Sequence, residues 1–298
     1  MDGAFPYLGE TFALLAAVVW AFAVILFKKS GETVHPLALN LFKNALAAAL
    51  FIPTIWVFGE TLTRRAPASD YLLLLLSGAL GIGIGDAMFF KSLNYIGAGL
   101  WSIVSCMYSP FIIGLSMVWL GDRLVLVQIA GAVMIVSALL ITIEKRRQVE
   151  IERRELLRGV LWGVSAMAAT AVGVVMIKPL LQRSPILWVT EVRLFGGITI
   201  LLLIILFHPS RYRIFFSAIP ARGWGYMVVG SFVGAYLAMF FWLAGMKFTQ
   251  VSIAAVLNQT SNIFVFIFAA LFLRELITVR RTVGIILAVS GALLVYFG

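Results

Sequence analysis

The segment 144–158, EKRRQVEIERRELLR, is strongly hydrophilic and stands at the middle of a 298-residue chain that is otherwise mostly apolar. Hydrophobic residues make up 62% of the chain and charged residues 12%, too little charge to cover a soluble protein of this size. Apolar runs of about 20 residues, the length that crosses a bilayer as a helix, recur on both sides of the segment. We therefore expect an all-α integral membrane protein with two halves, residues 1–148 and 149–298.

The apolar runs predict ten transmembrane helices, five in each half. Several connections are only a few residues long, so neighbouring helices are expected to pack antiparallel. The first run lacks a basic flank and a small-residue cleavage site, so we expect it to remain as a span. The expected spans are 10–28, 36–58, 70–92, 96–120, 124–143, 157–178, 185–207, 223–246, 250–273 and 279–297.

Basic residues are distributed unevenly between the connections. Those after odd-numbered spans carry most of the lysines and arginines, among them Lys28, Arg147, Arg213 and Arg281. Because cytoplasmic connections carry an excess of Lys and Arg, this pattern predicts an inner (plasma) membrane protein with the odd-numbered connections in the cytoplasm and both termini outside. The net charge of +10 then reflects contact with the lipid bilayer, not with nucleic acid.

Metal, disulfide and nucleotide chemistry find no support in the sequence. Cys106 is the single cysteine, His35 and His208 are isolated, and no cluster has metal-ligand spacing. The run GIGIG at 81–85 lies inside an apolar segment with no strand before it, so its spaced glycines favour close helix packing over nucleotide binding. We expect no metal and no cofactor.

The two halves of the chain repeat each other. The tetrapeptide AMFF occurs at 87–90 and again at 238–241, and Lys43 in the second span corresponds to Arg193 in the seventh. Five spans in each half place the halves in opposite orientations, an arrangement that lets two bundles rock about a midplane site. The alternative is that the repeat records only a gene duplication and a packing solution.

Corner motifs give the sequence a family resemblance. The first half has LGDRL at 120–124 followed by Gln128 and Gly131, the second has LRELIT at 273–278 followed by Gly284, and Pro110 lies in the fourth span. In these features the whole chain resembles the EamA family of the drug/metabolite transporter superfamily.

The resemblance implies a central cavity formed by spans one to four and six to nine, with spans five and ten as supports. It also implies export or exchange of amino acids, other small metabolites or drugs. The chain departs from the family in having Ser261 and Asn262 where a proline is expected. Its loop charges are also inverted, since the family is usually drawn with both termini in the cytoplasm.

Four ionisable side chains lie inside expected spans, where a charge is costly and points to function. Lys43 and Arg193 lie roughly 11 Å deep from opposite faces, at 1.5 Å per residue, and are candidates to bind a substrate carboxylate or phosphate. The alternative is an internal ion pair, for which Asp86 lies at a matching depth. Asp86 and Glu191 are also candidates for proton coupling.

Amide and aromatic side chains complete the candidate substrate site. Asn258 and Asn262 are four residues apart and share a helix face, where they are expected to contact substrate or, alternatively, a neighbouring helix. Trp20, Trp101 and Tyr108 are candidates for the walls of a cavity, with packing between helices as the alternative.

Two further expectations concern the backbone and the membrane interface. Pro110 lacks an N–H and is expected to kink the fourth span and free the carbonyl of Cys106. Trp188 and Trp224 lie near the ends of spans and are expected to be interfacial anchors.

The function that these residues favour is transport of a small organic metabolite by alternating access. An amino acid or related carboxylate is the first substrate class, because basic groups, amides and aromatics occur at similar depth; export follows from the resemblance alone. One alternative is a flippase for a lipid or lipid-linked sugar, which needs a lateral opening and a basic head-group site. A membrane-embedded enzyme is the other alternative, but the sequence shows no catalytic cluster.

Overall fold

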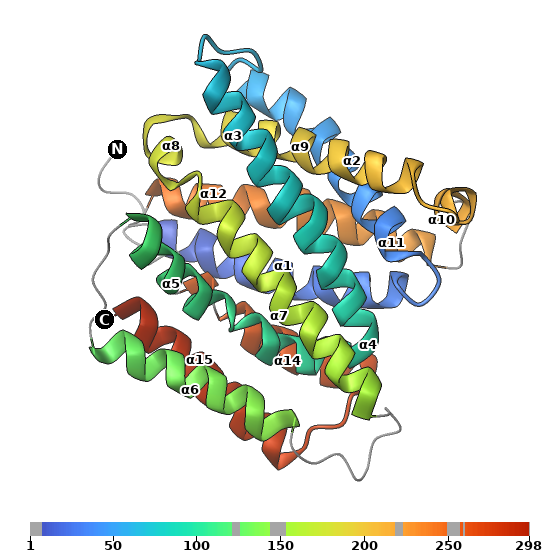
Figure 1. Ribbon diagram of the computed structural model, residues 1–298, viewed down its shortest axis with the longest axis vertical. Helices are drawn as coiled ribbons and strands as arrows, with labels where there is room; N and C mark the ends of the chain where they lie inside the picture. The colour runs from blue at the N-terminus through green and yellow to red at the C-terminus, as the bar shows by residue number, and fades with distance from the viewer. Residues whose placement is uncertain are drawn as a thin grey trace.

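The computed structural model describes residues 8–120, 126–143, 153–217, 223–248, 257–258 and 260–297. Figure 1 shows these residues as a bundle of helices. The expected all-α membrane fold of two repeats is confirmed. Six of the described helical segments are long and apolar enough to cross a membrane, and shorter apolar helices at 108–119, 129–138 and 261–273 accompany them. The number of ten spans stays a prediction.

The first half begins with two long helices and then a broken third segment. The His35 side chain accepts a hydrogen bond from the N–H of Leu37 at 3.3 Å, and Pro36 is the first residue of α2, a favoured start for a helix. The elements are α1 (Leu8–Ser30), α2 (Pro36–Val57), α3 (Ala68–Gly78), the π-helical segment η1 (Ala79–Gly85), α4 (Asp86–Ser105), α5 (Tyr108–Leu120) and α6 (Leu126–Ile143).

The second half has the same order of elements with short additional helices. Its elements are α7 (Arg153–Val175), α8 (Lys178–Arg183), α9 (Ile186–Leu206), α10 (Arg211–Ser217), α11 (Trp224–Gly230), the π-helical segment η2 (Ser231–Ala238), α12 (Met239–Phe248), α14 (Ser261–Leu273) and α15 (Val279–Phe297). The expected boundary between the halves, at residues 148 and 149, lies outside the described residues.

The two π-helical segments occupy equivalent places in the repeat. They begin at Ala79 and Ser231, and the offset of 152 residues (231 − 79) is close to the 151 residues (238 − 87) between the AMFF tetrapeptides. π-Helical turns are uncommon and frequently occur at functional sites. The repeated sequence therefore produces a repeated backbone irregularity.

The halves interlock instead of standing side by side. α1 packs along α11, η2 and α12 of the second half, and α7 packs along η1 and α4 of the first. α2 lies against α9, and α6 lies beside α15 at one edge of the molecule (Figure 1). The first helix of each half thus packs against helices of the other half, so the interface between the repeats runs through the centre of the molecule.

Glycines allow the closest approach between the halves, at the crossing of α3 and α9. A Cβ atom at Gly78 would lie 1.9 Å from the carbonyl oxygen of Arg193, and one at Gly196 would lie 2.2 Å from that of Leu75. The two backbones are therefore in direct contact, as small residues permit in membrane helices.

The connections after spans one, three and seven meet on one side of the molecule, which we call the basic side. Lys28 Nζ donates to the carbonyl of Asn94 at 3.1 Å, and the Asn94 amide donates to the carbonyl of Gly31 at 3.0 Å. The His35 N–H donates to Ser217 Oγ at 3.1 Å. These bonds join the connections after spans one, three and seven.

The connections after spans two and six lie on the opposite side, where one expectation is corrected. Arg183 and Asp70 form an ion pair at 2.8 Å there. Trp188, expected as an interfacial anchor, is only 1% exposed and packs edge-on against Tyr71 with ring centres 5.2 Å apart. That prediction is wrong because neighbouring helices cover the end of the span. Trp224 is 50% exposed.

Candidate functional site

Lys43 and Asp86 form an ion pair between the second and third spans. Lys43 on α2 is 5% exposed, and its ammonium group donates to the carboxylate of Asp86, the first residue of α4. The ammonium also lies 5.7 Å from the centre of the Phe90 ring. Of the two alternatives left open by the sequence, the structure gives the internal pair for Lys43.

Arg193 lies next to this pair without closing a salt bridge. Its side chain is half-buried and runs past Gly81 of η1, where a Cβ atom would be 3.5 Å from Nη2. Asp86 and Tyr108 are the groups that interact with it electrostatically. In the described part of the chain no carboxylate lies within 4 Å of the guanidinium, and its Nε has no hydrogen-bond partner. Arg193 therefore adds one positive charge to the neutral pair of Lys43 and Asp86.

Glu191 is fully buried on a different face of α9. Both carboxyl oxygens lack a hydrogen-bond partner among the described residues. Leu187 and Leu194 share its face, and they belong to an apolar cluster with Phe51 of α2. A buried, unpartnered carboxyl group is costly, so its position needs a functional or structural reason.

Two of the aromatic candidates, Trp20 and Trp101, lie close together. Phe89 joins them, since its ring centre lies 6.4 Å from that of Trp20 and 4.7 Å from that of Trp101. Trp101 is 5% exposed and packs in the core, whereas Trp20 and Tyr108 are half-buried. Trp20 and Tyr108 are therefore the aromatic candidates that keep an exposed surface.

Asn262 connects two helices. Its amide oxygen accepts a hydrogen bond from Ser105 Oγ at 2.7 Å, and its amide nitrogen lies 3.4 Å from Cys106 Sγ. This contact between α14 and α4 matches the alternative in which Asn262 binds a neighbouring helix. Asn258 is half-buried, and Gln259 lies outside the described residues.

The helix break near Pro110 adjoins the Asn262 contact. α4 ends at Ser105 and α5 begins at Tyr108, so Cys106 and Met107 interrupt the fourth span. The carbonyl of Cys106, expected to be free, accepts a hydrogen bond from the N–H of Ser109 at 3.2 Å.

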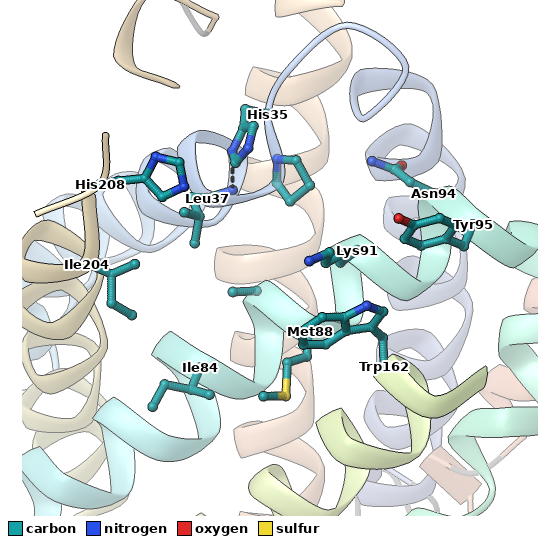
Figure 2. Close-up of a pocket in the computed structure, with 12 residues that line it drawn as sticks. His35, Leu37, Ile84, Met88, Lys91, Asn94, Tyr95, Trp162, Ile204 and His208 are labelled. Carbon is teal, nitrogen blue, oxygen red and sulfur yellow. Dashed lines mark hydrogen bonds between the residues drawn. The ribbon is translucent and has the colours of Figure 1, made fainter. Parts of the chain in front are cut away.

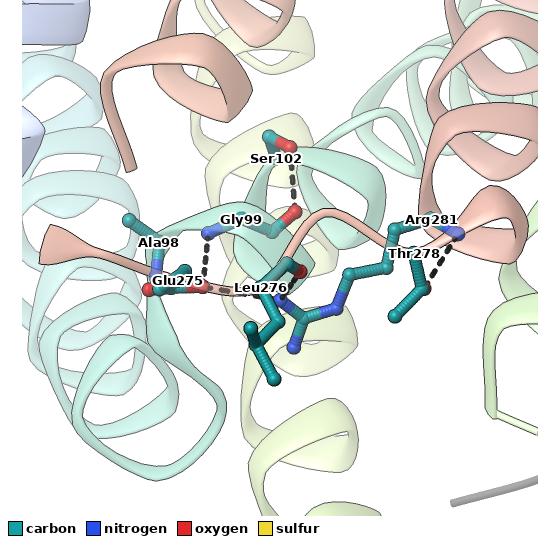
Figure 3. Close-up of polar contacts among 7 residues, drawn as sticks. All are labelled: Ala98, Gly99, Ser102, Glu275, Leu276, Thr278 and Arg281. Carbon is teal, nitrogen blue, oxygen red and sulfur yellow. Dashed lines mark hydrogen bonds and ion pairs between the residues drawn. The ribbon is translucent and has the colours of Figure 1, made fainter. Parts of the chain in front are cut away.

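Sequence reasoning missed the role of Glu275, which caps a helix of the other half (Figure 3). Gly97 has φ 76°, a left-handed backbone that suits glycine, and it breaks α4 between the third and fourth spans. The N–H groups of Ala98 and Gly99, at the start of the new helix, donate to the Glu275 carboxylate at 2.8 and 3.2 Å. Arg281 holds the same carboxylate at 3.5 Å.

The sequence did contain a signal for this contact, because Glu275 belongs to the corner motif LRELIT at 273–278. The corresponding first-half corner, Asp122 and Arg123, lies outside the described residues. The Glu275 cap ties the second half to the first on the basic side.

Two interlocked repeats of apolar helices, with charged side chains at their meeting point, define a polytopic membrane protein of repeat architecture. The chain belongs to the EamA-like transporter family, whose model matches it twice, over residues 7–143 and 157–297. The family resemblance seen in the sequence is thus confirmed.

Similar proteins agree with this family. The chain is 25% identical over 290 residues to an uncharacterized transporter of Archaeoglobus fulgidus, with 95% of each chain covered. A solved structure described only as the crystal structure of a protein superposes with a TM-score of 0.66 at 19% identity, covering 96% of this chain and 95% of the other. The latter likeness concerns the fold alone.

Proposed function

We propose that this protein transports a small organic metabolite, with an amino acid or related carboxylate as the first candidate, by exposing the region between its halves to each side in turn. The observation that carries the proposal is the Arg193 guanidinium, a half-buried cation beside an already neutral ion pair. Export is the direction that the family resemblance favours.

A carboxylate is the substrate group that fits Arg193. A guanidinium binds a carboxylate through two parallel hydrogen bonds, and in the described residues no carboxylate of the protein occupies that position. Tyr108 lies within electrostatic range of the same guanidinium, and Trp20 offers a partly exposed aromatic surface for the rest of a substrate. Lys43 acts in this proposal through Asp86, by fixing the position of its carboxylate.

Alternating access is supported by the position of the π-helical segment η1 beside Arg193 and directly before Asp86. Gly81 of η1 contacts Arg193, and Asp86 follows η1 directly. A change in the winding of η1 would therefore move Asp86 relative to Arg193. The segment η2 occupies the equivalent place in the other half, so the same change of winding is available to both repeats.

Uptake into proteoliposomes tests this proposal. The purified protein is reconstituted and screened with labelled amino acids, other carboxylates and cationic metabolites. Arg193→Gln is expected to abolish uptake of anionic and zwitterionic substrates, because the carboxylate loses its partner. Arg211→Gln, which removes an exposed arginine, is the matched control and should transport normally. Unchanged kinetics in Arg193→Gln would remove this residue from the site.

The second candidate is a flippase, favoured by a cavity that is lined by residues of α7 and α9 and carries basic residues. The same vesicles, loaded with a fluorescent phospholipid and bleached from outside with dithionite, measure its translocation. Rapid loss of the protected half of the signal, without uptake of carboxylates, would favour the flippase over the metabolite transporter.

A further inference from the structure

A cavity of about 620 Å³ lies on the basic side, away from the charged group described above. Figure 2 shows α4 crossing beneath it, with Trp162 of α7 on one flank and Ile204 and His208, at the end of α9, on the other. The cavity residues of α4 and the residue Asp86 lie on different faces of that helix. This cavity is therefore separate from the candidate substrate site.

The polar part of the cavity is basic. Lys91 Nζ lies 3.9 Å from the centre of the Trp162 ring, and within the described chain no carboxylate comes within ion-pair distance of it. His35 and His208, isolated in the sequence, lie with ring centres 6.4 Å apart at the mouth. No acidic residue is among the residues that line the cavity.

The rest of the cavity is apolar and continues into surface that faces lipid. Ile84, Met88 and Ile204 line the part that lies deeper along the helices. At its edges Leu161 of α7 is 65% exposed and Phe207, just after α9, is 80% exposed. In a membrane protein such large exposed apolar side chains contact acyl chains.

The basic part of the cavity lies nearer the membrane surface and the apolar part lies deeper, the same order as the head group and acyl chains of a phospholipid. His35 precedes the first residue of α2, and His208 follows the end of α9 by two residues, so the basic groups lie where the spans leave the bilayer. The apolar wall begins below them and runs toward the bilayer interior. Lys, Trp and Tyr side chains at this level are typical of contact with lipid head groups.

We propose that this cavity binds one anionic phospholipid of the adjoining leaflet, with its phosphate beside Lys91, His35 and His208 and an acyl chain along Met88 and Ile84. Charge complementarity selects this occupant, because the cavity presents the Lys91 ammonium and two imidazoles that can donate hydrogen bonds, and no carboxylate. Its apolar wall of Ile84, Met88 and Ile204 matches the chemistry of an acyl chain. The lipid would brace the ends of α4, α7 and α9 against one another.

Native mass spectrometry of the detergent-solubilised protein, titrated with phosphatidylglycerol or phosphatidylcholine, tests the proposal. The wild type is expected to retain one phosphatidylglycerol in preference to phosphatidylcholine. Lys91→Gln should weaken retention about fivefold, the factor that one basic residue near an anionic lipid contributes. Lys29→Gln, another lysine on the same side, is the control and should retain the lipid as the wild type does.

Three results would overturn the proposal. One is equal retention of the two lipids by the wild type, and another is unchanged retention by Lys91→Gln. The third is binding of inorganic phosphate that excludes phosphatidylglycerol, which would make the site one for a soluble anion. Because retention is measured without transport, Arg193→Gln should keep the lipid whether or not it loses uptake, so this proposal and the proposed function fail separately.

Discussion

Two residues of α9 show how one helix separates unlike environments. Arg193 and Glu191 are two positions apart, which turns their side chains to opposite faces. The Arg193 side chain runs past Gly81 of η1 and interacts electrostatically with Asp86. Glu191 is buried without a hydrogen-bond partner among the described residues, on the face that carries Leu194. The two side chains, although near neighbours in sequence, therefore do not form an ion pair with each other.

The histidines of the basic side give a pH prediction at the same scale. Burial lowers the pKa of His35 from its ordinary value of 6.5, and the nearby His208 and Lys91 lower it further. Without an anion, His35 is therefore neutral at pH 6.5 and above. A bound phosphate favours its protonated form, so retention of phosphatidylglycerol should strengthen as the pH falls from 7.5 to 5.5.

Lipid titrations at several pH values check this expectation, with His35→Gln as the comparison. The variant should bind the lipid with a shallower pH dependence than the wild type. The folding stability of the lipid-free protein should change with pH in the opposite direction to lipid affinity. A lowered pKa means that the unfolded state binds more protons than the folded state below pH 6.5, so the lipid-free fold should lose stability as the pH falls below that value. Lipid affinity that weakens with acidification would contradict the assignment.

At the scale of elements, the crossing of α3 and α9 depends on glycines, of which Gly78 makes the closest approach. A Cβ at Gly78 would lie 1.9 Å from the Arg193 carbonyl oxygen, which belongs to backbone and cannot rotate away. Gly78→Ala should therefore push the helices apart and cost at least about 1–3 kcal/mol, the usual penalty for overpacking.

Gly225→Ala provides the matched control for this substitution. Gly225 is also helical, but its Cβ would meet nothing within 4 Å, so alanine should leave stability unchanged or raise it slightly. Thermal unfolding in detergent compares the two variants. A Gly78→Ala protein as stable as Gly225→Ala would show that the crossing is looser than described.

The break in α4 gives the second prediction about elements. The Glu275 carboxylate accepts the N–H groups of Ala98 and Gly99, and such a cap contributes about 1–2 kcal/mol. Glu275→Ala should therefore weaken the contact that joins the halves on the basic side. Cys106, the single cysteine, is fully buried on the same span, so its reaction with a thiol reagent measures how often this side opens.

Labelling of Cys106 by a membrane-permeant maleimide measures the effect. The rate should rise several-fold in Glu275→Ala, in line with the loss of about 1 kcal/mol from a closed state. Glu32→Gln, which removes an exposed acid from the same side, should label like the wild type. Equal rates in all three proteins would mean that the cap plays no part in closing this side.

At the scale of the whole molecule, the sequence predicts the fold better than the contacts within it. Apolar length, the central hydrophilic segment and the repeated AMFF are local signals, and they indicate a membrane protein of two repeats. Contacts between distant residues leave no such signal. Glu275 caps a helix that begins 177 positions earlier (275 − 98), and His35 meets a histidine 173 positions later (208 − 35). Trp188 lies near a span end, but helices that pack over that end bury it.

The same limits apply to the candidate site. Depth along the spans places Lys43 and Asp86 at one level, and the structure joins them. Depth does not say which way each side chain points. It therefore left open whether Asn262 contacts substrate or a helix, and the hydrogen bond from Ser105 gives the helix contact.

Membrane orientation is the prediction that belongs to the molecule as a whole. The connections after spans one, three and seven meet on one side, and Glu275, in the connection after span nine, lies close enough to interact electrostatically with Lys28 there. Most lysines and arginines of the connections follow odd-numbered spans. Since positive connections are retained in the cytoplasm, this side should be cytoplasmic and both termini external, opposite to the usual drawing of the family.

Reporter fusions decide the orientation. Alkaline phosphatase, which is active only outside the cytoplasm, should be active when fused after Gly298 and inactive when fused after Arg147 in the central basic connection. Green fluorescent protein exported in unfolded form stays dark, so it should give the reverse pattern at the same two sites. A bright fusion at Gly298 with an active phosphatase at Arg147 would reverse the assignment. The lipid proposed for the basic side would then come from the outer leaflet, and the site would have to select it from the lipids of that leaflet.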